Sequence, residues 1–141
     1  MSETVALDFE LKSPIDRVWH ALTDSATLSK WMMFKVNDFK PVVGHTFQFR
    51  ESPGWTGIID CEVIEVDEPH KLSYSWASDQ LGPSNQQYST VVTWTLTEEA
   101  GITRLHLEQS GFPAEAKQEI GGARYGWTNM LEALQSHLAA G

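Results

Sequence analysis

Two acidic residues, Asp60 and Glu62, have a spacing that could support acid–base chemistry. They are two positions apart in a segment expected to form a strand, so both side chains should point to the same face of a sheet. A buried pair of carboxylates can donate and accept protons, whereas a pair on the outside of a sheet is simply solvated. We favour the solvated interpretation, and the sequence leaves catalytic residues unassigned.

The histidines and the cysteine predict neither a metal site nor a nucleophile. His106 and Glu108 share the strand face opposite to Leu105 and Leu107, which predicts an exposed pair rather than metal ligands. Cys61 lies inside an expected strand, a position that is typical of inert, buried cysteines. No Gly-x-Ser-x-Gly elbow or glycine-rich phosphate loop occurs, and we expect no cofactor. No His-x-x-x-His spacing links the five histidines, which are His20, His45, His70, His106 and His137.

The aromatic side chains point to a different chemistry, the binding of a flat apolar ligand. Six tryptophans among 141 residues provide large contact surfaces, which a few polar groups can complement. Aromatic rings can also simply fill a core, and this is our interpretation of Trp19. For Trp76, Trp94 and Trp127 both interpretations stay open. The candidate ligand-binding residues are Trp31, Phe47, Phe49, Trp55, Tyr74, Trp76, Trp94, Gln109, Trp127, Met130, Leu131 and Leu134.

Two of these candidates are polar and are expected at inward-facing positions. Gln109 continues the alternation of Leu105 and Leu107, so its amide should point into the protein. A buried amide requires partners, which could be a ligand, a trapped water molecule or the backbone. The Tyr74 hydroxyl could orient a carbonyl or phenol group of a ligand, or it could reach the surface.

A helix near the C-terminus is expected to close the space in which these side chains meet. Beyond Gly126 the chain is nearly free of charge, and its apolar residues recur at helical spacing. A long helix after a run of strands must bury such a stripe against the sheet, and a curved sheet then leaves a pocket between them. The stripe consists of Trp127, Met130, Leu131, Leu134 and Leu138.

The rest of the chain predicts one strand, two short helices and five further strands. Ser13 is expected to cap the first helix, with Pro14 at its first position and Asp16 in its first turn. Asp24 is expected to cap the second helix. The first helix should cover 15–22, and the strands should cover 5–11, 45–52, 55–68, 71–78, 89–99 and 102–110.

Some details of the sheet follow from alternation, and others stay open. Apolar residues occur on both faces of the segment 55–68, so its inward phase is not fixed. Loops at 78–88 and 110–120 are expected to control access to the pocket. The inward residues of the last two strands should be Val92, Trp94, Leu96, Leu105, Leu107 and Gln109.

Composition restricts the class of protein. Ten basic against 19 acidic residues give a net charge of −9. The chain therefore lacks the basic surface that nucleic-acid binding requires, and binding to an anionic membrane is disfavoured for the same reason. No apolar run approaches the roughly 18 residues of a membrane span, and the first residues do not resemble a secretory signal. A single cysteine cannot form an internal disulfide, so we expect a cytoplasmic protein. The length of 141 residues predicts one domain over residues 1–141.

Residues across the whole chain carry a resemblance to a known family. The opening segment contributes Pro14, Val18, Trp19, Ala21, Leu22, Thr23, Asp24 and Trp31, and the central hairpin contributes Glu65, Pro69, Leu72, Tyr74 and Trp76. The last hairpin contributes Val92, Trp94, Leu96, Thr103, Leu105, Ser110, Gly111 and Phe112, and the final helix contributes Gly126, Trp127, Leu131 and Leu134. With these residues the chain resembles the SRPBCC (START/Bet v1-like) superfamily, and within it the family named after the activator of Hsp90 ATPase.

The resemblance implies a fold more strongly than a function. The implied fold is an α+β helix-grip, a curved antiparallel sheet around a C-terminal helix, in the order β-α-α-β-β-β-β-β-α. Relatives include lipid and steroid carriers, polyketide cyclases and plant ligand-binding proteins, which share a cavity rather than a reaction. The eponymous co-chaperone has a separate domain that this chain lacks, so a chaperone partner is not expected. We expect a monomer or a weak homodimer.

Reversible binding of a small aromatic, polyketide-like or lipid-like molecule is therefore the leading functional hypothesis. A cyclase, dehydratase or hydrolase acting on such a molecule is the first alternative, and it requires a titratable group inside the pocket. A protein-interaction module similar to the co-chaperone is the second, and it requires an exposed apolar patch.

Overall fold

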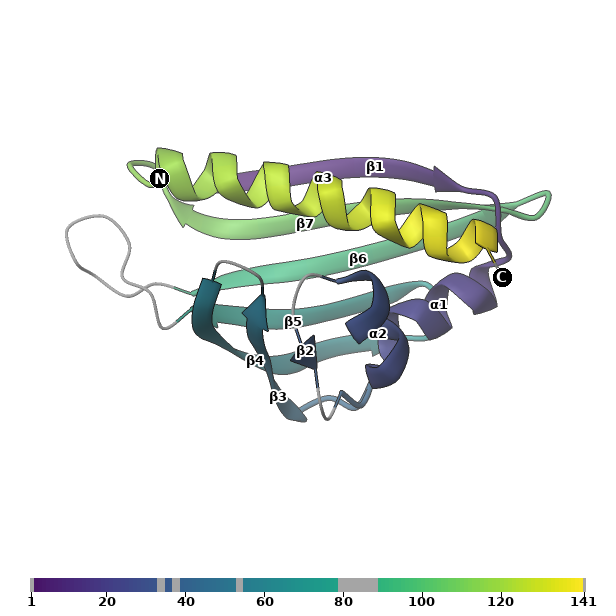
Figure 1. Cartoon of the computed structure of the whole chain (residues 1–141), viewed down its shortest axis with the longest axis horizontal. Coiled ribbons are helices and arrows are strands. Elements are labelled where there is room, and N and C mark those ends of the chain that lie inside the picture. The colour runs from purple at the N-terminus through teal and green to yellow at the C-terminus, as the bar shows by residue number, and fades with distance from the viewer. Residues whose placement is uncertain (1, 33–34, 37–38, 53–54, 79–88, 141) are drawn as a thin grey trace.

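The computed structural model describes residues 2–32, 35–36, 39–52, 55–78 and 89–140 (Figure 1). The order of elements is the expected β-α-α-β-β-β-β-β-α pattern with one addition, the two-residue strand β2. The strands are β1 (Ser2–Leu11), β2 (Lys35–Val36), β3 (Thr46–Ser52), β4 (Trp55–Asp67), β5 (Lys71–Ser78), β6 (Thr90–Glu99) and β7 (Ile102–Pro113). The helices are α1 (Ile15–Thr23), α2 (Ser25–Trp31) and α3 (Lys117–Ala140).

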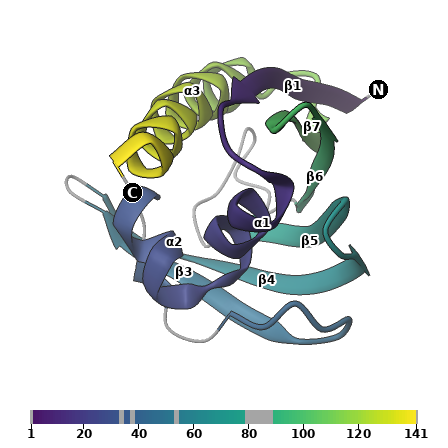
Figure 2. The ribbon, with the colours of Figure 1, turned by 90° about the vertical axis from the view of Figure 1, so that its right-hand side faces the viewer.

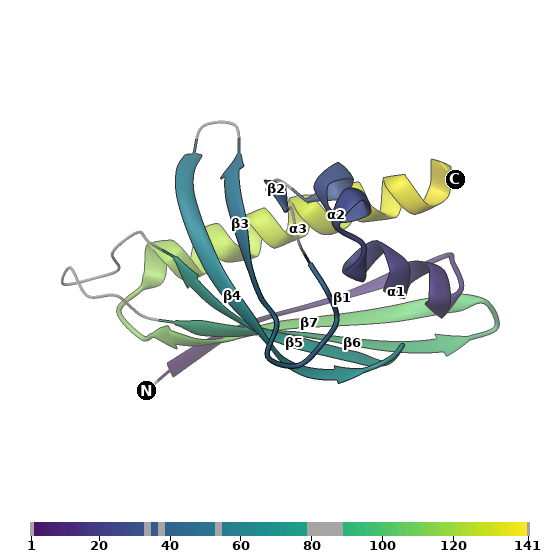
Figure 3. The ribbon, with the colours of Figure 1, turned by 90° about the horizontal axis from the view of Figure 1, so that it is seen from below.

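One antiparallel sheet with the order β1-β7-β6-β5-β4-β3-β2 forms the body of the molecule. Seen along the long axis, the sheet curves around, and α3 lies between its two ends beside β1 and α2 (Figure 2). The helices α1 and α2 lie across one end of the sheet, while the β3–β4 hairpin extends beyond α3 on one side (Figure 3). The observed architecture is the expected α+β helix-grip.

A register shift in β4 changes which residues of this strand face inward. In β4 the register shifts between Val63 and Glu65, so Ile64 is an extra residue whose side chain is 47% exposed. The inward phase is therefore Ile59, Cys61 and Val63 before this position, and Val66 packs against the core after it. This bulge explains why the sequence shows apolar residues on both faces of the strand.

Helix α1 begins differently from the expected arrangement. Pro14 occupies the N-cap position rather than the first helical position, and no side chain of the N-cap residue makes a capping hydrogen bond. The predicted cap by Ser13 is wrong, because the N-cap residue is Pro14. Ser13 is buried one position earlier, and its carbonyl accepts a hydrogen bond from Thr103 Oγ1 at 2.7 Å. The backbone N–H of Ile15 donates instead to Glu98 Oε2 at 2.9 Å.

The predicted cap of α2 is confirmed, since the Asp24 side chain accepts from the backbone N–H of Thr27 at 3.0 Å. The hydroxyl of Thr27 donates to the same carboxylate oxygen at 2.7 Å. These bonds are the main reason that the pKa of Asp24 lies below its usual value. The helix thereby holds the buried side chains of Leu28 and Trp31 toward the core.

The segment 110–120 is a strand end and a helix start rather than an access loop. Strand β7 continues to Pro113, and α3 begins at Lys117, ten residues before Trp127. The exposed Gly121 and Gly122 break the apolar periodicity of this first part of α3, so the sequence pattern did not predict it. The other proposed access loop, 78–88, lies outside the described residues from position 79 onward.

Candidate functional site

Aromatic side chains from the sheet and two helices meet between the sheet and α3. The Trp94 ring lies 5.4 Å from Trp127 and 6.2 Å from Trp31, both nearly perpendicular. The centroid of the Trp76 ring lies 5.4 Å from that of Trp127 and 5.1 Å from that of Phe49, so Trp76 connects these two rings. We call the following residues the aromatic cluster: Trp31, Phe47, Phe49, Tyr74, Trp76, Trp94 and Trp127.

Alternation along the strands and helical spacing direct these rings inward. Phe47 and Phe49 are separated by the polar Gln48, and Tyr74 and Trp76 by Ser75, so each pair lies on the inner face. Six of the seven rings are at most 5% exposed, whereas Trp76 is only partly buried. Trp76 is thus the member of the cluster nearest to solvent.

A chain of hydrogen bonds crosses this apolar interior. The indole N–H of Trp127 donates to Gln109 Oε1 at 2.7 Å, and Gln109 Nε2 donates to Thr90 Oγ1 at 2.8 Å. The Thr90 hydroxyl in turn donates to the backbone carbonyl of Trp76 at 3.3 Å. The chain therefore runs from α3 through β7 and β6 to β5.

The buried Gln109 is oriented as the sequence predicts, but its partners are different. The expected alternatives were a ligand, a water molecule or the backbone, whereas the structure supplies two side chains. Gln109 is 3% exposed and Thr90 is 2% exposed, so both bonds lie away from solvent. Such bonds are costly to break, because an unpaired buried polar group loses its hydration without compensation.

A second buried polar contact joins Tyr74 and Trp94. The indole N–H of Trp94 donates to the Tyr74 hydroxyl at 2.9 Å, and both side chains are at most 2% exposed. The Tyr74 hydroxyl therefore does not reach the surface. Burial is the main cause that raises the pKa of Tyr74, and the hydrogen bond from Trp94 opposes it.

The other titratable groups singled out by the sequence offer little chemistry to the interior. Burial raises the pKa of the Cys61 thiol, so this residue is a neutral thiol at neutral pH. Asp60 and Glu62 are exposed on the outer face of β4, as expected. Within the described part of the chain, no group of three or more histidine, cysteine or acidic residues is placed to hold a metal ion.

His106 also lies on the outer face, as predicted, and it has two acidic partners. Its Nδ1 is 2.7 Å from Asp8 Oδ1 and its Nε2 is 2.9 Å from Glu108 Oε1. The hydrogen bonds with Glu108 and then Asp8 raise the pKa of His106 above its usual value. The three residues form a surface pairing between β1 and β7.

Almost all predicted ligand-binding residues belong to one buried core or contact it. Met130 is 4% exposed, and Leu131 and Leu134 are completely buried on the same side of the helix as Trp127. Trp19 is buried in the core cluster, in agreement with its interpretation as a core residue. Trp55 is the first residue of β4, and its side chain lies outside the described part of the structure.

Two residues of this region escaped the sequence analysis. Thr90 lies two positions before Val92 and four before Trp94, on the same face of β6. Continuing the inward alternation back by one more residue pair would have identified it. Phe39 contacts Phe47 at 4.8 Å and Tyr74 at 6.2 Å between ring centroids. It precedes β3 outside any helix or strand, where no periodicity indicates which side chains face inward.

The curved sheet, the long C-terminal helix and the enclosed aromatic cluster define an α+β protein of the helix-grip class. The family model described as "Activator of Hsp90 ATPase homolog 1-like protein" matches residues 12–139, and the chain belongs to this family. Among curated proteins, none matches this sequence. No helix in the described ranges has both the length and the apolar character needed to cross a bilayer.

Solved structures agree with this assignment. Protein MLL2253 from Mesorhizobium loti superposes with a TM-score of 0.89 at 37% sequence identity, covering 98% of each chain. DynU16, from the dynemicin biosynthetic locus, gives 0.80 at 24% identity, covering 96% of this chain and 47% of that chain. The Aha1 dimer from Colwellia psychrerythraea gives 0.78 at 18% identity and 96% coverage of both chains. The last two similarities show a shared fold.

Proposed function

We propose that this protein reversibly binds a small, neutral, largely apolar molecule, aromatic, polyketide-like or lipid-like, between the sheet and α3. The observation that carries the proposal is the chain from Trp127 through Gln109 to Thr90. Polar groups are costly in an apolar interior, and a few fixed ones among aromatic rings are typical of small-molecule sites. The occurrence of DynU16 in the dynemicin biosynthetic locus is consistent with this proposal.

Spare hydrogen-bonding capacity gives such a ligand polar contacts. Each Gln amide has two N–H groups, and the bond with Thr90 uses one of them. The Tyr74 hydroxyl accepts from Trp94 and keeps its own hydrogen to donate. A ligand with a carbonyl or ether oxygen could accept from either group.

The electrostatics of the interior favour binding over acid–base catalysis. Two buried titratable side chains at the cluster, Tyr74 and Cys61, have raised pKa values and are neutral near neutral pH. A general base must be deprotonated near the working pH, which neither residue achieves. A charged ligand would meet no opposite charge from these two residues.

The achievable affinity is modest. Burying some 300 Å² of apolar ligand surface at roughly 25 cal/mol per Å² yields about 7 kcal/mol before the costs of association. We therefore expect dissociation constants in the micromolar range or weaker.

Tryptophan fluorescence titration tests the proposal with flavonoids, sterols, fatty acids and polyketide-like aromatics as probes, and mass spectrometry checks each for turnover. We expect saturable quenching by neutral members of the panel and no new products. Trp76→Phe should weaken binding because its ring contacts both Phe49 and Trp127, whereas Trp19→Phe is the matched control. Product formation would instead establish an enzyme, and equal affinities for both variants would contradict the proposed location.

A further inference from the structure

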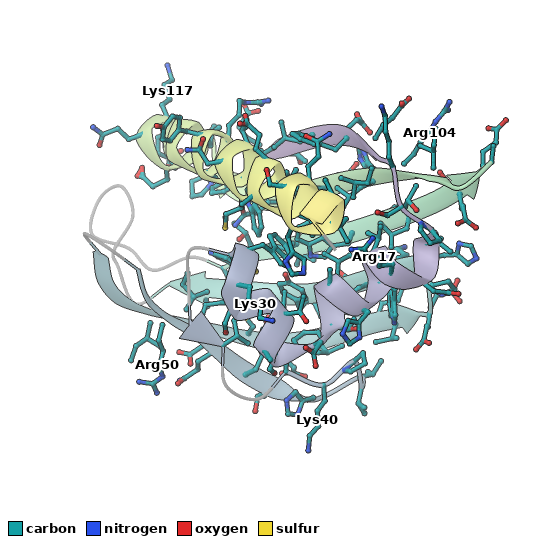
Figure 4. The ribbon with its side chains drawn as sticks, turned by 45° about the vertical axis from the view of Figure 1, so that its right-hand side comes forward. Arg17, Lys30, Lys40, Arg50, Arg104 and Lys117 are labelled. Atoms are coloured by element: carbon teal, nitrogen blue, oxygen red, sulfur yellow. The ribbon has the colours of Figure 1, made fainter. Side chains whose placement is uncertain are left out.

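A second candidate site lies on the opposite face of the sheet from the aromatic cluster. The outward side chains of β3, β4 and β5 border a hollow of about 550 Å³, a volume within the range of small-molecule sites. We call it the outer hollow and define it by Thr46, Gln48, Arg50, Asp60, Glu62 and Ser75. Arg50 lies on the side of these strands that faces away from α3 (Figure 4).

Strand register explains how the outer hollow forms. Thr46 pairs with Glu62, and Gln48 pairs with Asp60, which in turn pairs with Ala77 on β5. β5 thus contributes small side chains to the hollow while β3 and β4 contribute long polar ones. Because alternate residues of a strand share a face, the same alternation that directs Phe47 inward places these residues outside.

Three side chains of the outer hollow are held in a fixed order by hydrogen bonds. The Arg50 guanidinium donates to Gln48 Oε1, and Gln48 Nε2 donates to Asp60 Oδ1 at 2.6 Å. An arginine has five N–H donors, and most of those of Arg50 have no partner among the described residues. The cation and the anion are therefore positioned by the amide between them.

The remaining polar groups lie at the other end of the outer hollow. The Ser75 hydroxyl oxygen accepts from the backbone N–H of Glu62 at 2.9 Å, which leaves its hydrogen free to donate. The Glu62 carboxylate has no hydrogen bond or ion pair with any other described residue. The hollow thus presents a positive group at one end and carboxylates toward the other.

We propose that the outer hollow binds short zwitterionic peptides, with Arg50 contacting the peptide carboxylate and Asp60 and Glu62 contacting its ammonium group. Asp60 pairs with Gln48 and Glu62 pairs with Thr46, so the two carboxylates lie two and four residues along β3 from Arg50. At roughly 3.3 Å per residue, these separations are about 7 Å for Asp60 and about 13 Å for Glu62. An extended peptide of two to three residues spans about 7 to 11 Å. The two carboxylates disfavour a purely anionic ligand, and Arg50 disfavours a purely cationic one.

Amide chemical-shift mapping by NMR tests the proposal with triglycine as the probe. N-acetyltriglycine, which lacks the ammonium group, and triglycinamide, which lacks the carboxylate, are the matched controls. We expect triglycine to cause saturable shifts in β3, β4 and β5 around the outer hollow. Each blocked peptide should bind about five- to tenfold more weakly, the effect of losing one exposed charge-assisted contact.

Two arginine variants separate this site from general electrostatics. Arg50→Ala should weaken triglycine binding about five- to tenfold, whereas Arg104→Ala, on β7 beside Glu10, should leave it unchanged. Absence of saturable shifts, equal affinity for the blocked peptides, or equal effects of the two variants would each overturn the proposal. The inner site is probed by different ligands, so its failure and this one are distinguishable.

Discussion

The Gln109 side chain connects α3 to the sheet through two buried hydrogen bonds. It is the acceptor for Trp127 of α3 and the donor to Thr90 of β6, so one side chain connects the helix to the sheet. An amide in this position specifies where α3 lies, because sliding the helix along the sheet would break a buried bond.

Replacing Gln109 by leucine should therefore destabilise the protein. The substitution keeps a similar volume but leaves the indole N–H of Trp127 without its acceptor, at a cost of about 1–3 kcal/mol. Urea unfolding of the variant measures this loss. In the double variant Gln109→Leu, Trp127→Phe, the second change should cost less than Trp127→Phe does alone; strictly additive losses would contradict the coupling.

The pairing of His106 with two carboxylates predicts a pH-dependent contribution to stability. The pKa of His106 is higher in the folded than in the unfolded protein, where it is near 6.5. The contribution of the pairing to stability is therefore complete when the pH is below the unfolded pKa, and it is lost as the pH rises through the folded pKa. The side chains are exposed, so the contribution should be below about 1 kcal/mol. His106→Asn should thus lower the free energy of unfolding at pH 6 but hardly at pH 9. A difference that is the same at both pH values would refute the assignment.

At the level of single residues, alternation predicted much of the candidate site. It directed Gln109, Tyr74 and Trp94 inward because the strands that carry them are regular. It could not identify hydrogen-bond partners, which depend on register between strands and on the position of α3. For this reason the contacts of Gln109 with Thr90 and Trp127 were not predicted.

Among the elements, α1 depends on a distant hairpin for its N-terminus. Glu98, next to the turn between β6 and β7, accepts from the backbone N–H of Ile15, 83 positions earlier in the sequence. A carboxylate at this place satisfies an otherwise unpaired amide and also favours the positive end of the helix dipole. Local sequence rules cannot find such a cap, which is why Ser13 was wrongly assigned.

Removing this contact should loosen α1 specifically. Glu98→Ala should lower the free energy of unfolding by about 1 kcal/mol, a typical loss for a helix cap, and should speed amide exchange at the start of α1. Glu99→Ala changes the neighbouring exposed acid and is the matched control. Equal effects of the two variants on exchange in α1 would rule out capping by Glu98.

Replacing either of two glycines by alanine should change stability in opposite directions. Gly111 lies in β7 at a shift in its register with β1, has a φ of +101°, and a Cβ there would be 3.2 Å from the Ser89 carbonyl oxygen. Gly111→Ala should therefore lower the free energy of unfolding by about 1–3 kcal/mol.

Gly121 in α3 has open space around it, so Gly121→Ala should stabilise the helix by about 0.5–1 kcal/mol. Thermal unfolding of both variants measures these effects, and the same sign for both would contradict the described backbone.

The order and type of the elements followed from the sequence better than their ends did. Periodicity identified β5 with its observed bounds, because alternation is unbroken along this strand. It could not fix the phase of β4, where the bulge at Ile64 shifts the inward set by one residue. Nor could it locate the start of α3, where glycines replace the apolar stripe.

For the molecule as a whole, the sheet separates two faces with different chemistry. The inner face carries aromatic rings and neutral polar groups, which suit an uncharged apolar ligand. The outer face carries charged side chains, including those of the outer hollow and of the His106 pairing. The labelled basic side chains are spread over several elements rather than gathered on one surface (Figure 4).

The most direct test of ligand binding between the sheet and α3 is an NMR titration that follows the tryptophan indole N–H signals. The probe is the neutral aromatic compound that quenches fluorescence most strongly. We expect the signals of Trp94 and Trp127 to shift and saturate together, because their N–H groups lie inside the aromatic cluster, while that of Trp19 stays in place. Binding that leaves Trp94 and Trp127 unchanged, or no saturable shift with any compound of the panel, would contradict an inner binding site.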